Sequence, residues 1–187
     1  MTRIFLTLAA ADFLSLTLTF ALGCWSKLTD GLHASAGSVY LLHFLFGLFT
    51  AVGTLLVHCL IFTYFLGTGR WVKEVTLAYD LPDEPWHKRT RELKRQTFPP
   101  ALAAMLVTIV TAAAGAGAQL QAWPWTVHFT LGIATLLVNA WAIRLEYRNV
   151  RINAATLDEV LAEVDRVRAK RGLPPNAEAL AEDLRPT

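Results

Sequence analysis

Three histidines of this chain lie inside long apolar stretches, where an ionisable side chain is costly and usually has a function. His43 and His58 fall on one predicted helix, about 22 Å apart along its axis and about 60° apart around it, so both can face the same side. His128 falls on a different apolar stretch. Because imidazole titrates near neutral pH and commonly binds metals, these three histidines are candidates for a functional site within a membrane.

The elements that must position these histidines are four apolar stretches, at about residues 4–24, 38–66, 101–120 and 125–143. A helix needs roughly 20 residues to cross a bilayer. The chain has 187 residues, of which 54% are hydrophobic and 17% charged, whereas soluble domains carry about 25% charged residues. We therefore predict an all-α fold, a four-helix transmembrane bundle. Asp12 interrupts the first stretch, so we expect a retained helix rather than a cleaved signal peptide.

Lysine and arginine cluster in two regions, the connection between the second and third stretches and the tail after the fourth. The other two connections contain only one such residue, Lys27. Basic residues near helix ends are retained in the cytoplasm, so both termini are predicted to be cytoplasmic, and the compact loops favour a bacterial inner membrane. We divide the chain into a four-span domain, 1–148, and a cytoplasmic helical tail, 149–187.

The predicted cytoplasmic parts contain short helices in the 67–98 loop and in the tail. Gly67 and Gly69 mark the end of the second span, and a capping-box pattern begins a tail helix at Thr156 that Gly172 can end. That tail helix has an apolar stripe whose partner is the loop, the membrane surface or another subunit. We predict no internal repeat. The stripe consists of Leu157, Val160, Leu161, Val164 and Val167.

Depth along the helices, at about 1.5 Å per residue, places the polar residues of the spans in two layers. His43 and His128 share the outer layer. The inner layer contains Asp12, His58, Met105 and Asn139. This arrangement is similar to that of diheme b-type cytochromes, in which histidines on one helix serve hemes near opposite membrane faces.

The resemblance implies an outer heme b whose iron is bound by His43 and His128. It implies an inner heme bound by His58, with Met105 or a residue of a partner subunit as the second ligand. A four-helix diheme cytochrome usually offers four histidines, and only three lie within the spans here. The inner heme is therefore one ligand short on this chain unless Met105 supplies it.

Other roles remain open for the same residues. His43 and His128 can act only as hydrogen-bond donors between helices, and His58 can pair with Asp12, either structurally or as a proton shuttle. Met105 can simply fill space. The sequence contains no GxSxG, HExxH, GxGxxG or GxxxxGK[ST] pattern, so neither a nucleotide site nor a soluble catalytic site is predicted. The basic loop has no nucleic-acid-binding context.

The leading hypothesis is a small integral membrane subunit of a respiratory or electron-transfer complex that binds heme b, rather than a stand-alone enzyme. Its predicted partners are membrane lipid and other membrane-protein subunits. One alternative is a non-catalytic scaffold or assembly subunit that recruits partners through its cytoplasmic loop and tail. Another is a proton or small-solute carrier that uses Asp12 and His58, although four spans without a broken-helix pair suit transport poorly.

Overall fold

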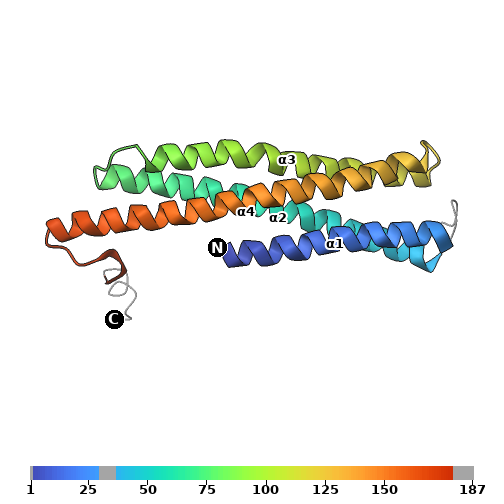
Figure 1. Ribbon diagram of the computed structural model, residues 1–187, viewed down its shortest axis with the longest axis horizontal. Coiled ribbons are helices and arrows are strands. Elements are labelled where there is room, and N and C mark those ends of the chain that lie inside the picture. The colour runs from blue at the N-terminus through green and yellow to red at the C-terminus, as the bar shows by residue number, and fades with distance from the viewer. Residues whose placement is uncertain (1, 30–36, 179–187) are drawn as a thin grey trace.

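The computed structural model describes residues 2–29 and 37–178, which contain four long helices. These pack side by side as one elongated bundle (Figure 1). α1 and α3 each contact both α2 and α4, so α2 and α4 occupy diagonal corners. The predicted all-α four-helix bundle is confirmed. The helices are α1 (Thr2–Thr29), α2 (Ser38–Ala78), α3 (Trp86–Gln119) and α4 (Trp125–Lys170).

The bundle is polar inside and apolar outside over much of its length. Thr54, His58 and Asn139 are fully buried, whereas Phe49 is 70% exposed and Leu137 is 66% exposed. Such large exposed apolar areas are unfavourable in water but suit a surface that faces lipid. Each of the four helices contains a stretch long and apolar enough to cross a membrane. The chain is therefore a four-span integral membrane protein.

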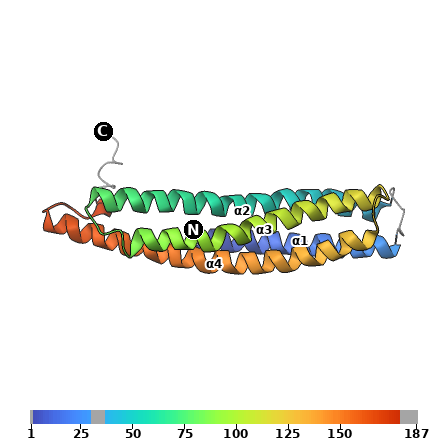
Figure 2. The same cartoon turned by 90° about the horizontal axis from the view of Figure 1, so that it is seen from above.

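Three of the helices extend well beyond the length of a membrane span. α2 has 41 residues and α4 has 46, which correspond to about 60 and 70 Å at 1.5 Å per residue, against a hydrocarbon layer of about 30 Å. α1 has only 28 residues and begins near the middle of the long axis (Figure 1). Past that point α2, α3 and α4 continue side by side (Figure 2). We call this three-helix extension, residues 67–78, 86–98 and 150–170, the stalk.

The predicted short helices of the loop and tail are continuous parts of the long helices. α2 continues through Gly69 to Ala78, Pro99 lies inside α3, and α4 passes Thr156 without a break. A glycine inside a helix costs only about 1 kcal/mol. The buried face of α2 continues on both sides of Gly69, and this packing outweighs that cost. The predicted end of the tail helix is confirmed, because α4 stops at Lys170 and Gly172 adopts a φ of 70°.

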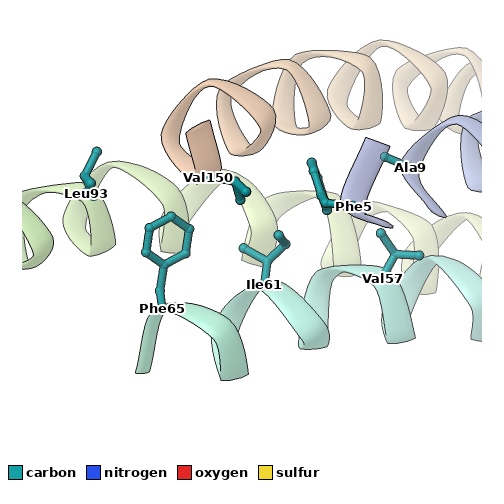
Figure 3. Close-up of a cluster of buried hydrophobic side chains, with 7 residues drawn as sticks. All are labelled: Phe5, Ala9, Val57, Ile61, Phe65, Leu93 and Val150. Atoms are coloured by element: carbon teal, nitrogen blue, oxygen red, sulfur yellow. The ribbon is translucent and has the colours of Figure 1, made fainter. Parts of the chain in front are cut away.

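Two apolar clusters hold the stalk and its junction with α1 together. The junction cluster joins all four helices (Figure 3) and consists of Phe5, Ala9, Val57, Ile61, Phe65, Leu93 and Val150. The stalk cluster is formed by Val72 of α2 with Val160 and Val164 of α4, and Trp71 and Trp86 pack against it. The apolar stripe of the tail is therefore covered in part by α2 and by the start of α3, within the same chain.

Val160→Ala is expected to lower the free energy of unfolding by about 2 kcal/mol, because it removes fully buried methyl groups from the stalk cluster. Leu77→Ala is the matched control, since Leu77 of the same stalk is 72% exposed. Chemical unfolding of the detergent-solubilised proteins, followed by circular dichroism, compares the two variants. Equal stabilities of the two variants would contradict the packing of the tail against α2.

Candidate functional site

The outer histidines meet in the interior of the bundle. His43 comes from α2 and His128 from α4, the two helices at diagonal corners. Their ring centroids are 6.1 Å apart, and the ring planes make an angle of 65°. The structure thus brings together the two residues that the sequence places at one depth.

Each of these rings is held by a backbone carbonyl of the neighbouring helix. His43 Nδ1 donates to the carbonyl oxygen of Thr19 on α1 at 3.0 Å, and His128 Nδ1 donates to that of Thr111 on α3 at 2.9 Å. A carbonyl oxygen only accepts hydrogen bonds, so the proton of each neutral ring lies on Nδ1. The lone pair then lies on Nε2, which is the arrangement of a histidine prepared to bind a metal.

A glycine makes room for each ring. A Cβ atom on Gly23 would lie 2.8 Å from Cε1 of His43, and a Cβ atom on Gly115 would lie 2.9 Å from Cε1 of His128. Contacts this short do not occur between a real Cβ atom and a ring, so any larger residue would displace the imidazole. Gly23 and Gly115 therefore determine where the two rings lie.

The same sequence pattern builds both halves of the site. A threonine lies four residues before a glycine on α1, at 19–23, and on α3, at 111–115. α2 and α4 each carry the pattern His-Phe-x-x-Gly-x-x-Thr, at 43–50 and 128–135. The expectation of no internal repeat is therefore wrong. The repeat is difficult to recognise because its few matching positions are separated by dissimilar apolar residues. Different apolar side chains are equally compatible with a surface that faces lipid, so these positions need not match.

His58 of the inner layer uses both ring nitrogens within the protein. Nε2 lies 3.0 Å from Oδ1 of Asn139, whose own amide nitrogen donates to the carbonyl oxygen of Thr135 at 2.9 Å. Nδ1 lies 2.7 Å from Oε1 of Glu146, and both side chains are fully buried. With Glu146 as a carboxylate, both partners are acceptors and both nitrogens donate, which is the hydrogen-bonding pattern of an imidazolium. In this arrangement neither nitrogen is left to bind iron.

Glu146 is the functional candidate that the sequence interpretation misses, because it lies beyond residue 143, where the fourth span was predicted to end. One signal would have found it. In the sequence, the polar residues Asn139, Glu146, Asn149, Asn153 and Thr156 recur at steps of three, four or seven from the span into the tail, which predicts one continuous helical face. That face consists of Thr135, Asn139, Ala142, Glu146, Asn149, Asn153, Thr156, Val160 and Val164.

The other predicted residues of the inner layer have different partners. Asp12 Oδ1 accepts a hydrogen bond from Thr54 Oγ1 at 2.8 Å. The sulfur of Met105 lies 4.0 Å from that of Cys59. In the described part of the chain, His58 makes no hydrogen bond to Asp12 or Met105. Of the predicted inner set, only His58 and Asn139 are directly bonded to each other.

Threonines connect the inner layer to the outer histidines along two routes. On one route, the hydroxyl of Thr54 bonds both Asp12 and the carbonyl oxygen of Thr50, and Thr19 Oγ1 donates to Thr50 Oγ1 at 3.0 Å. On the other route, Asn139 bonds the carbonyl oxygen of Thr135, whose hydroxyl is 2.6 Å from that of Thr111. Thr19 and Thr111 are also the residues whose carbonyls hold His43 and His128. The two layers are therefore parts of one polar column.

A lysine lies near the outer end of this column. Lys27 Nζ is 4.0 Å from the centroid of the Trp125 ring, and it is shielded from solvent with no hydrogen-bond partner among the described residues. Lys27 follows Gly23 by one helical turn, and Trp125 precedes His128 by three residues. An ammonium group buried without an acceptor is unfavourable, so an anionic group beside it would be stabilising.

In the described residues, no group of three or more His, Cys, Asp or Glu side chains is placed to hold a bare metal ion. The outer pair supplies two imidazoles alone, which suits a metal that arrives with most of its ligands. No family model matches this chain, and no curated protein or solved structure is significantly similar to it. The function of this chain is therefore inferred from the geometry of the column and its histidines.

Proposed function

We propose that this protein binds one heme b between α2 and α4, with His43 and His128 as the two iron ligands, and that it carries electrons as a small subunit of a membrane complex. The proposal depends on one observation above all: two imidazoles from diagonal helices have their ring centroids 6.1 Å apart, each with Nδ1 bonded to a backbone carbonyl. Heme would supply a one-electron iron couple, which the side chains of this chain do not provide.

The distance between the two rings suits one iron atom. A histidine nitrogen binds a metal at about 2 Å, so the centroids of two imidazoles on opposite sides of one metal are about 6 Å apart. The observed distance is 6.1 Å. A heme brings its own nitrogen ligands, so His43 and His128 would be the only two iron ligands that the protein has to supply. Lys27 is the residue that would neutralise a heme carboxylate at the outer end.

We propose one heme rather than two. An inner heme would need His58, but hydrogen bonds to Asn139 and Glu146 already use both of its ring nitrogens. The apolar stripe of the tail, which the scaffold alternative assigns to a partner, packs partly within the chain. We further propose that the stalk is cytoplasmic in a bacterial inner membrane, because it contains most of the basic residues of the chain.

The test is a reduced-minus-oxidised visible spectrum of the detergent-solubilised protein after expression with ample heme. The proposal predicts a sharp α-band and, by pyridine hemochrome assay, one heme per chain. A ratio near two would overturn the single-heme proposal. A colourless, folded protein that does not take up added hemin would overturn heme binding altogether.

Gly23→Ala is expected to weaken heme binding at least tenfold, the loss typical when a group that orients a metal ligand is disturbed. The added methyl group would push the His43 ring away from the carbonyl of Thr19. Gly53→Ala is the matched control, because a Cβ atom there meets nothing within 4 Å. Hemin titration followed by absorbance compares the two variants. Equal affinities would exclude a role for Gly23 in seating the ligand.

A further inference from the structure

The inner part of the polar column contains several acceptor oxygens that no donor reaches. Four buried oxygens have no hydrogen-bond partner among the described residues, and each sits on a side chain that bonds through its other polar atom. A buried acceptor without a donor is unfavourable unless a water molecule or a proton meets it. The four atoms are Asp12 Oδ2, Glu146 Oε2, Asn149 Oδ1 and Asn153 Oδ1.

These oxygens form a path toward the stalk. Glu146, Asn149 and Asn153 follow one another at three- and four-residue steps on the buried face of α4, so each lies about one turn from the next. The amide nitrogen of Asn149 bonds Thr97, and that of Asn153 bonds Tyr64 and Thr68. A chain of water molecules bonded to the free oxygens would connect the interior of the stalk with the inner layer.

In the part of the chain that the structure describes, the inner layer holds two carboxyl groups, Asp12 and Glu146, and one histidine, His58. The carboxylate of Glu146 is paired with His58, which donates from both nitrogens. Among the described residues, Asp12 receives one hydrogen bond, from the hydroxyl of Thr54, and it is only 6% exposed. His58 of α2 and Glu146 of α4 are the charged groups that face it, and residues 96–119 of α3 contain no titratable side chain. An ionised Asp12 is therefore one uncompensated negative charge within a span.

We propose that Asp12 is a proton-binding site that takes up one proton when the heme proposed between His43 and His128 gains one electron. This inference rests on the proposed function. Asp12 lies seven residues before Thr19, about 10 Å along α1, and the Thr54–Thr50–Thr19 bonds connect it to the carbonyl that holds His43. Charges about 10 Å apart change each other's binding affinities about tenfold at an effective dielectric constant near 20.

The step balances in charge and in atoms. Transfer of one electron from a one-electron reductant would remove one positive charge from a heme held by His43 and His128. One proton leaves water at the stalk end and forms an O–H bond with Oδ2 of Asp12, so the total charge of the column stays constant. Reoxidation by a one-electron acceptor returns the proton. Reduction then favours protonation, and the midpoint potential rises as the pH falls.

The experiment is spectroelectrochemical titration of the detergent-solubilised holoprotein at a series of pH values. As the pH falls through the range in which Asp12 takes up its proton, the midpoint potential of the heme in the unmodified protein is expected to rise by about 59 mV in total. For a one-electron couple, about 59 mV corresponds to a tenfold change in binding affinity. Asp12→Asn is expected to lose this rise, and Asp158→Asn, a change at an exposed stalk aspartate, is expected to keep it. A pH-independent potential in the unmodified protein, or an unchanged rise in Asp12→Asn, would overturn the inference.

A second measurement does not require a variant that folds. The infrared difference spectrum of the unmodified protein, reduced minus oxidised, is expected to show the C=O stretch of a newly protonated carboxyl group, shifted in D₂O. Absence of this band would also overturn the inference. If no heme spectrum is obtained at all, the proposed function itself fails. A heme spectrum with neither pH dependence nor a carboxyl band overturns only the proton site.

Discussion

His43→Ala and His128→Ala are each expected to abolish the sharp α-band of the reduced-minus-oxidised spectrum. Each is also expected to weaken hemin binding by more than about 100-fold, because mutation of residues that only orient a metal ligand already costs about 10- to 100-fold. Each histidine would supply one of the two iron ligands that come from the protein. The two halves of the site are built by equivalent residues, with a carbonyl and a glycine behind each ring. The two variants should therefore be affected alike.

The matched control is His87→Ala, because His87 lies in the stalk and pairs with Asp83 far from the outer layer. This variant is expected to keep both its spectrum and its hemin affinity. Spectra and hemin titrations of the three purified variants provide the comparison. If either His43→Ala or His128→Ala retains the spectrum of the unmodified protein, the assignment of the ligand pair is wrong.

Glu146→Leu is expected to lower the free energy of unfolding by about 3–5 kcal/mol, the usual consequence of removing one partner of a buried ion pair. His58 would keep its hydrogen bond to Asn139, but its charge would be buried without a counterion. The double variant His58→Leu, Glu146→Leu is expected to recover part of the loss, because it removes both charges together. Chemical unfolding in detergent, followed by circular dichroism, measures each variant.

Glu159→Gln is the control for this experiment, because Glu159 forms an exposed ion pair with Arg89 in the stalk. Exposed pairs contribute about 0–1 kcal/mol, so a small effect is expected. A loss for Glu146→Leu as small as that for Glu159→Gln would mean that His58 is neutral and that the two side chains form only an ordinary hydrogen bond. The charge balance around Asp12 would then have to be revised.

Most of the fold can be predicted from the sequence, because the four apolar stretches have the length that a bilayer requires. The outer pair follows from the same information, since helical rise places His43 and His128 at one depth. The inner layer is predicted less well. Glu146 lies 88 residues after His58 along the chain, and nothing near either residue indicates the other.

By itself, the sequence determined the number of spans, the apolar outer surface and the common level of His43 and His128, because these depend only on local composition and the regular rise of a helix. Only the tertiary structure decided that Gly69 and Pro99 lie within unbroken helices, and that His58 bonds Glu146 rather than Asp12. These outcomes depend on which faces of α2, α3 and α4 pack together. Packing between distant segments overrides local helix preferences and selects the partners of buried polar groups.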